Sequence, residues 1–277
     1  MAAHTKRSGQ KPMTQIELAT VLAGAKPFKD GNVNETFQGQ IHLGGGVVRG
    51  AILKDLDPRQ LANELLVSVL ARRAGLPTPD AYLALVRGND LPVVRGPSLP
   101  DGNRLVFASV DVKVPNVTFR LRGAPAEQQG GLVAEILQWA GLGGLYGFDA
   151  WVANVDRHPG NLLFGSKDQV WLIDHGHCLS GPMWTPEDLM EDGEYNNRLA
   201  EWLTVRMSLE QKQIRLAEAN TLANALPAID VNEATSASLV AGILPDADIA
   251  AAKTFLRGRI GNVPNHASKA LGIPVLL

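Results

Sequence analysis

The chain has almost no cysteine and almost no net charge. Its 277 residues include one cysteine, Cys178, which excludes an intramolecular disulfide framework and any cysteine-rich zinc site. The 26 basic and 28 acidic residues leave a net charge of −2, so the overall charge offers no attraction for nucleic acid or for an anionic membrane surface. We therefore expect neither kind of partner.

Long hydrophobic runs are also missing. No apolar stretch approaches the roughly 20 residues that are needed to span a bilayer. Residues 1–13 are polar and basic, lack the apolar core of a signal peptide, and predict a flexible tail. We therefore expect a cytoplasmic protein.

The sequence has enough apolar residues for a substantial core, at 45% hydrophobic content. This is sufficient for one large domain or for two lobes. Short runs punctuated by glycine fill residues 14–110, and helical patterns dominate residues 111–277 apart from one stretch discussed below. These patterns predict a β-rich N-terminal lobe followed by an α-rich C-terminal lobe.

Four strands are expected in the first part, at residues 36–43, 47–54, 76–86 and 104–110. The first two are joined by a G-G-G turn and should pair antiparallel. Residues 13–25 fit either a short helix or a strand edge. The turn D-G-N-V-N-E-T, which contains Asn34 and Thr36, offers backbone N–H groups where a phosphate could lie, although such a segment is more often an ordinary hairpin turn.

A helix is predicted for residues 57–74, because Asp57 is a good N-cap acceptor and Pro58 suits the first helical position. Lys54 ends the strand before this helix, and Glu64 lies beside the apolar face of the helix. The two side chains could therefore meet in one cleft. The alternative is a solvated lysine and an ordinary helical glutamate.

The second part predicts a buried helical spine over residues 131–153, interrupted at Gly143 and Gly144. Amphipathic patterns then predict helices at residues 199–207, 209–226, 231–243 and 246–259.

Residues 148–179 carry the most informative pattern of the chain. Asp156 and Asn161 stand five residues apart around a Pro-Gly turn, and Asp174 directly follows a second apolar run. A carboxylate in such a loop can orient the proton of an attacking hydroxyl, and the amide oxygen and second carboxylate can hold Mg²⁺. The pattern therefore favours magnesium-assisted phosphoryl transfer over a merely well-made turn.

Two other chemistries fit this stretch less well. His158, His175, His177 and Cys178 suggest zinc, but strand alternation would send His175 and His177 to one face and Cys178 to the other. A nucleophilic hydrolase is disfavoured, since the sequence has no G-x-S-x-G motif and Cys178 has apolar neighbours.

These residues also carry a family resemblance. N-V-D-R-H-P-G-N-L-L-F-G with V-W-L-I-D-H-G-H-C-L resembles the catalytic and metal-binding loops of the HipA-like kinases. The same stretch is similar to the D-R-H-x-x-N and I-D-F-G-H loops of phosphatidylinositol kinases. The motifs N-E-T, A-I-L-K, N-E-L-L and A-G-L-P-T-P resemble HipA-like kinases as well, so the match covers about residues 31–179 in order.

The resemblance implies an α+β fold of the bilobal protein-kinase type, in which ATP and Mg²⁺ bind between the lobes. It implies that Asp156 is the catalytic base, that Asn161 and Asp174 are metal ligands, and that Lys54, supported by Glu64, binds phosphate. Asn34 and Thr36 would belong to the nucleotide-binding turn. The sequence departs from the wider kinase pattern in having D-H-G instead of D-F-G and in lacking a full G-x-G-x-x-G loop.

Three functions follow as hypotheses. The first is an ATP- and magnesium-dependent kinase of protein serine or threonine, its own residues included. The second keeps the chemistry but uses a lipid or small-molecule hydroxyl, of which the lipid is disfavoured by the near-neutral charge. The third is a nucleotide-binding, pseudokinase-like scaffold, which the intact residue set disfavours. A regulatory protein partner is implied for some relatives.

Overall fold

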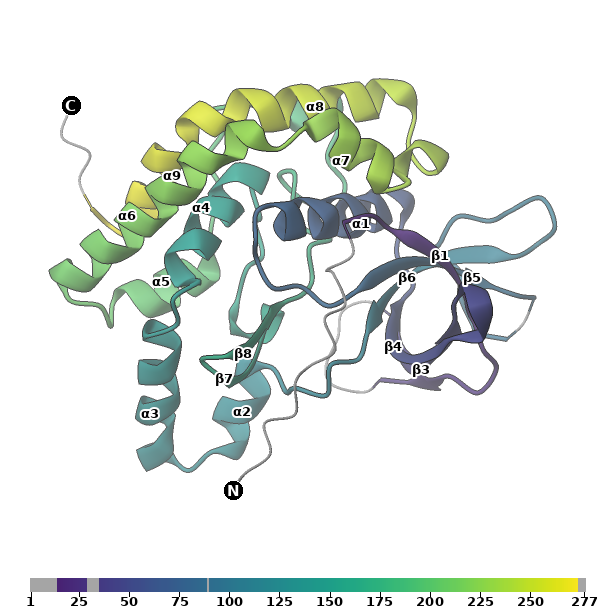
Figure 1. The fold of residues 1–277 in the computed structure, drawn as a ribbon, viewed down its shortest axis with the longest axis horizontal. Coiled ribbons are helices and arrows are strands. Elements are labelled where there is room, and N and C mark those ends of the chain that lie inside the picture. The colour runs from purple at the N-terminus through teal and green to yellow at the C-terminus, as the bar shows by residue number, and fades with distance from the viewer. Residues whose placement is uncertain (1–13, 29–34, 89, 274–277) are drawn as a thin grey trace.

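The computed structural model describes residues 14–28, 35–88 and 90–273. Within them a curved sheet and one long helix are followed by a larger helical part that contains a short hairpin. Figure 1 shows the sheet on one side of the molecule and most of the helices on the other.

The main sheet has six strands in the order β1-β5-β6-β4-β3-β2, and β1 also pairs with β3. This extra pairing makes the sheet curl into the ring visible in Figure 1. The strands are β1 (Glu17–Val21), β2 (Lys26–Pro27), β3 (Thr36–His42), β4 (Val48–Lys54), β5 (Ala81–Val86) and β6 (Arg104–Val110). Fourteen buried apolar side chains, Phe37, Ile41 and Leu53 among them, fill the interior of the curl.

The sequence predicted this sheet well where glycine and alternation mark the strands. The paired strands β3 and β4 agree with the expectation, with Thr36 opposite Lys54 in an antiparallel register. The segment 13–25 contains the strand β1, which pairs parallel to β5, so the helix alternative was wrong. The strand expected from residue 76 begins at Ala81, because two prolines precede it and the chain there instead accepts a hydrogen bond from Leu172 N at Pro77 O.

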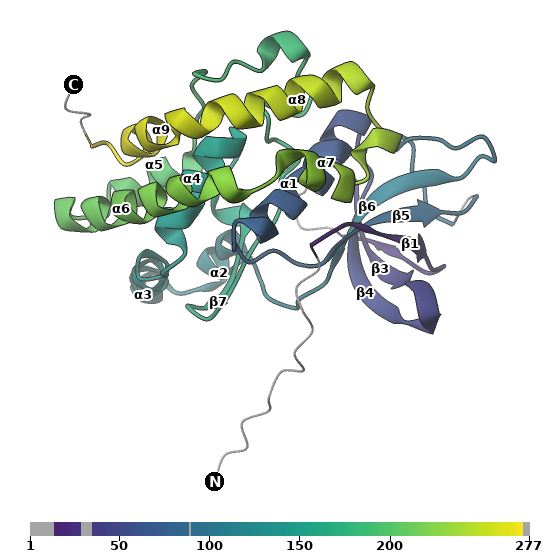
Figure 2. The same ribbon diagram turned by 45° about the horizontal axis from the view of Figure 1, so that its top comes forward.

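Helix α1 (Pro58–Arg73) lies close to its predicted limits and has Pro58 at its first position. The expected side-chain cap is absent, because the carboxylate of Asp57 pairs with Arg95 instead. Nearly all of α1 is buried, since the sheet covers one side and α7 (Val231–Ala237) covers another. Figure 2 shows α1 between the sheet and the C-terminal helices.

The remaining helices are α2 (Val117–Gly123), α3 (Ala126–Leu137), α4 (Leu142–Val152), α5 (Arg198–Thr204), α6 (Leu209–Ala225), α8 (Asp246–Arg259) and α9 (Val263–Ala270). They pack around a second and larger apolar core that also includes much of α1. No helix in the described ranges is long and apolar enough to cross a membrane.

The predicted spine over residues 131–153 is two helices, and its break lies before the glycines rather than at them. α3 ends at Leu137 and is mostly exposed, whereas α4 is buried except at Gly144. Gly143 lies inside α4 because α6 approaches closely there: an added Cβ would lie 2.5 Å from Arg215 O. The expected helix 231–243 is also shorter, because α7 ends at Ala237 and Leu239 adopts a left-handed φ of 61°.

Candidate active site

Lys54, Glu64 and Asp174 meet where the sheet contacts the helical part. The Nζ atom of Lys54 lies 2.6 Å from Glu64 Oε1 and 3.2 Å from Asp174 Oδ1. The Lys54 and Glu64 side chains are 12% and 1% exposed, whereas that of Asp174 is 36% exposed. The contact that the sequence suggested for Lys54 and Glu64 is therefore present, and a third charged group joins it.

The position of Lys54 follows from its place at the end of β4. It pairs with Thr36 on one neighbouring strand and with Phe107 on the other, and its ammonium lies 5.8 Å from the centroid of the Phe107 ring. Thr36 is thus buried beside Lys54. Asn34, the other residue expected in the nucleotide-binding turn, lies outside the described residues.

Helix α1 fixes Glu64 from the other side. While Oε1 of Glu64 contacts Lys54, Oε2 accepts a hydrogen bond of 2.9 Å from the backbone N of His175, the residue after Asp174. Glu64 therefore ties the strand lysine to the backbone that carries Asp174, and it does so with both oxygens of one buried carboxylate.

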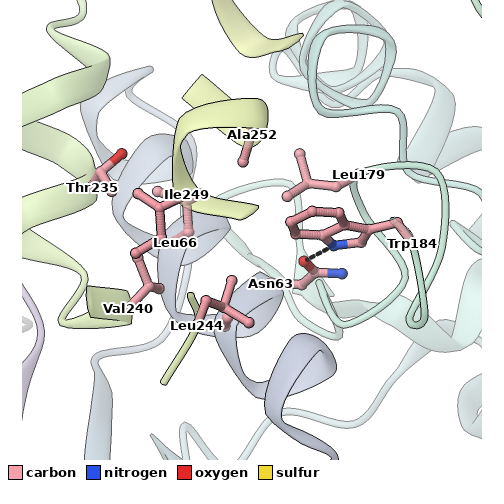
Figure 3. A pocket seen from close by; sticks show the side chains of 10 residues that line it. Asn63, Leu66, Leu179, Trp184, Thr235, Val240, Leu244, Ile249 and Ala252 are labelled. Carbon is pink, nitrogen blue, oxygen red and sulfur yellow. Dashed lines mark hydrogen bonds between the residues drawn. The ribbon is translucent and has the colours of Figure 1, made fainter. Parts of the chain in front are cut away.

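Asn63, the neighbour of Glu64, anchors the same helix to the loop after Asp174. Its amide nitrogen donates to the carbonyls of Gly176, Cys178 and Gly181 at 2.9 to 3.1 Å. Its oxygen accepts from Trp184 Nε1 at 2.9 Å, the dashed line in Figure 3. The apolar cavity in that figure lies behind α1 against α7 and α8, so it belongs to the packing of α1 and contains none of the predicted site residues.

Asp156 stands in the loop that follows α4. The helix ends at Val152, and the next residue, Ala153, has a left-handed φ of 45° that turns the chain out of the helix. Asn154 Oδ1 then accepts a hydrogen bond from Asp156 N at 3.1 Å. The side chain of Asp156 is 31% exposed and its Oδ1 lies 2.8 Å from Nη1 of Arg198, a residue 42 positions further along the chain.

The hairpin of β7 (Leu162–Ser166) and β8 (Gln169–Leu172) brings Asn161 and Asp174 to the same end. Leu162 pairs with Leu172, and Ile173 N donates to Asn161 O at 3.2 Å. Asn161 precedes this pair on one strand and Asp174 follows it on the other. Because the amide nitrogen of Asn161 donates to Asp156 O at 2.9 Å, its Oδ1 is left as the atom for a ligand.

Arg157 holds this hairpin end from within the core. It is fully buried and pairs with the equally buried Asp149 of α4, with Nε 3.1 Å from Oδ2. Its Nη1 donates to Ile173 O at 2.9 Å and to Asn161 O at 3.2 Å. One guanidinium therefore binds the backbone at both predicted metal ligands: at Asn161 itself and at Ile173, the residue before Asp174.

Lys54 and Asp174 stabilise each other's charged forms. Burial lowers the pKa of Lys54, but Asp174 and Glu64 outweigh that effect and raise it above its ordinary value. Burial likewise raises the pKa of Asp174, and Lys54 more than offsets this, so the pKa lies below its usual range. Both groups are therefore ionised at pH 7. Asp174 also has a left-handed φ of 61°, a conformation that is costly for a non-glycine residue.

The histidines after Asp174 differ from the arrangement expected along a strand. β8 ends at Leu172, so residues 173–178 lie in a loop and the alternation argument does not apply to them. His175 is buried beside Arg157, and burial together with the charges of Arg157 and Lys54 lowers its pKa well below the usual range. Burial also raises the pKa of the Cys178 thiol well above its ordinary value, which leaves it a poor nucleophile.

The donor set fits Mg²⁺ with a nucleotide better than a metal held by protein alone. In the described ranges, no three His, Cys, Asp or Glu side chains gather as a metal site. Magnesium requires less, because it keeps waters and phosphate oxygens as ligands beside one or two carboxylates. Asp174 supplies a partly exposed carboxylate, Asn161 an amide oxygen, and Lys54 a cation suited to phosphate.

Four residues of this site were not singled out from the sequence: Asn63, Asp149, Arg157 and Arg198. Asn63 and Arg157 stand next to residues that were, within N-E-L-L and D-R-H, so the motifs themselves contained a signal. Asp149 and Arg198 have no motif that links them to the loop. Arg198 reaches the site through a contact with a residue 42 positions away, and Asp149 through a buried ion pair with Arg157, eight positions away.

No protein-family model matches the chain, and no curated protein matches it. Among solved structures, it is similar to the crystal structure of a Helicobacter pylori proinflammatory kinase, CtkA, with a TM-score of 0.54 and 13% sequence identity. The match covers 90% of this chain and 97% of that one. At this identity the similarity shows the fold alone: the chain has a mixed fold of helices and strands that is similar to the fold of a kinase.

Proposed function

We propose that the chain is an ATP- and magnesium-dependent phosphotransferase of the HipA-like type, which transfers phosphate to a serine or threonine hydroxyl of a protein. The observation that carries the proposal is the position of Lys54 Nζ, 2.6 Å from Glu64 and 3.2 Å from Asp174, beside a hairpin end that holds Asn161 and Asp156. The kinase-like fold supports it, because this fold suits nucleotide binding between two lobes. The curled sheet and α1 would form one lobe and the helical part the other.

Each residue then has a role that its surroundings support. Lys54 binds phosphate oxygens, and Glu64 holds it in place because both of its oxygens are already engaged. Asp174 and Asn161 would hold Mg²⁺, which neutralises the charge of the phosphates when bound. Asp156 accepts or orients the proton of the attacking hydroxyl, since its side chain reaches solvent. Thr36 would lie at the phosphate end of the nucleotide, and Asn34, outside the described residues, is expected to take part in binding the phosphates.

The experiment is mass spectrometry of the purified protein incubated with Mg-ATP, alone and with a cell lysate. We expect added phosphate on serine or threonine of this chain or of lysate proteins. Asp156→Ala and Asp174→Ala should abolish it. Asp168→Ala is the matched control, because this aspartate is exposed in the turn of the same hairpin, and it should keep full activity.

Thermal unfolding separates the alternatives. Mg-ATP at 100 times its dissociation constant should stabilise the protein by about 2.7 kcal/mol. Stabilisation without transfer to protein, small molecules or water would identify a nucleotide-binding scaffold. Transfer to a small-molecule hydroxyl alone would change the acceptor but not the chemistry. If Mg-ATP gives no stabilisation and no phosphate is transferred, the proposal is refuted.

A further inference from the structure

The guanidinium of Arg198 lies against the carboxylate proposed as the catalytic base. Its Nη1 is 2.8 Å from Asp156 Oδ1, and the two side chains are 58% and 31% exposed. An ion pair as exposed as this one adds little to folding stability, because solvent screens it and two side chains lose their freedom. Stabilising the fold is therefore not the main effect of this pair.

The chain around Arg198 is built onto the Asp156 loop. On one side, Leu199 N donates to Arg157 O at 2.7 Å. On the other, the amide nitrogen of Asn197 donates to Asp149 Oδ2 at 3.0 Å, while its oxygen caps α5 by accepting from Ala200 N. Asn197 and Leu199 are buried, whereas Arg198 between them is exposed. Two fixed neighbours thus hold one cation in front of Asp156.

The pairing leaves half of the carboxylate available. Oδ1 of Asp156 is engaged by Arg198, whereas Oδ2 lies 4.0 Å from His158 Nε2, beyond hydrogen-bond distance. An acceptor hydroxyl can therefore approach Oδ2 while Arg198 fixes the orientation of the group. Arginine also has five N–H donors in a rigid fork, so contact with one carboxylate oxygen leaves others for phosphoryl oxygens.

We propose that Arg198 is a further catalytic residue, which orients Asp156 and donates hydrogen bonds to the phosphoryl group during its transfer. In that step the acceptor oxygen bonds to the γ-phosphorus, and the bond from this phosphorus to the bridging oxygen breaks. The electron pair leaves on ADP, and the hydroxyl proton passes to Asp156 Oδ2. Negative charge on the transferring oxygens is what a fixed guanidinium stabilises. This inference rests on the proposed function.

The test compares Arg198→Ala and Arg198→Lys with the wild type in steady-state phosphate transfer from Mg-ATP. Removing one such donor lowers kcat by about 100-fold or more, and we expect this with little change in KM for ATP. Lysine should restore only part of the rate, because it is a point charge without the fork. Added guanidinium should partly rescue Arg198→Ala. Arg206→Ala is the matched control and should keep its activity, because Arg206 is an exposed arginine that lies just after the end of α5.

Several results would overturn the assignment. If the activity of Arg198→Ala is within a few-fold of wild type, Arg198 has no catalytic role. If the activity is higher than that of wild type, Arg198 inhibits the reaction. A variant that loses both its Mg-ATP stabilisation and its activity, without rescue by guanidinium, would show a purely structural residue. In all these cases an active wild type leaves the proposed function standing, whereas an inactive wild type refutes both.

Discussion

Replacing Arg157 by methionine should destabilise the protein severely. The guanidinium and its partner Asp149 are both 0% exposed, so the change leaves a carboxylate in the core without its counter-charge. Breaking one side of a buried pair costs about 3–5 kcal/mol. The carbonyls of Ile173 and Asn161 lose a donor as well, which favours the upper half of that range.

The expected shift in melting temperature follows from the size of the chain. At about 2.1 cal/mol/K per residue, the unfolding entropy of 277 residues is about 0.6 kcal/mol/K, so a loss of about 4–5 kcal/mol should lower Tm by about 7–9 °C. The loss of stability relative to wild type should depend on pH. Burial raises the pKa of Asp149, and without Arg157 it would rise further, so the variant should lose stability as the pH increases.

Calorimetry at pH 5 and pH 8 measures both effects. The deficit should be smaller at pH 5, where the carboxyl is more readily protonated. Lys269→Met is the control, since it removes an exposed pair with Glu194 and should hardly change Tm. The buried pair is not what stabilises this loop if Arg157→Met has the same Tm as Lys269→Met, or if its loss of stability relative to wild type is larger at pH 5 than at pH 8.

Three further predictions concern other contacts. Glu64→Gln should lower the rate of phosphate transfer about 100-fold while the protein stays folded, because Lys54 loses its carboxylate partner; an unchanged rate would contradict the role of the pair. Asn63→Leu should cost about 2–4 kcal/mol in urea unfolding, because it leaves Trp184 Nε1 and three carbonyls without their partner; a loss below about 1 kcal/mol would count against it. Burial and nearby Arg259 and Lys269 lower the pKa of His266 to about 4, below its ordinary value, so stability should fall by about 2 kcal/mol between pH 7 and pH 5 as the unfolded chain takes up the proton. His266→Asn should flatten that dependence, and an equally steep curve would assign it to another group.

The sequence located the elements where local chemistry decides them. Glycine turns and alternation marked β3 and β4, and Pro58 marked the start of α1. The hairpin end with Asn161 and Asp174 was also visible, because a Pro-Gly turn and two apolar runs define it locally. These features depend on residues that are near one another in the chain.

The parts that sequence reasoning missed depend on distant contacts. Asp57 looked like a helix cap, but Arg95 takes its carboxylate from 38 positions away. Arg157 was not singled out, because charged side chains are rarely fully buried unless they are paired, and the sequence does not show that Asp149, within a largely apolar helix, is its partner. No periodicity joins Arg198 to Asp156.

The anchoring of Asn63 has a consequence for how this protein can be switched. In a molecule that turned on and off by swinging α1, the helix would need a second position of similar free energy. Here such a swing would break every hydrogen bond of Asn63 at once and open the apolar contact of α1 with α7. We therefore expect the helix, the Asp174 loop and the C-terminal helices to move as one unit, and control of the site to act on access to it and not on the assembly of the Lys54–Glu64 pair.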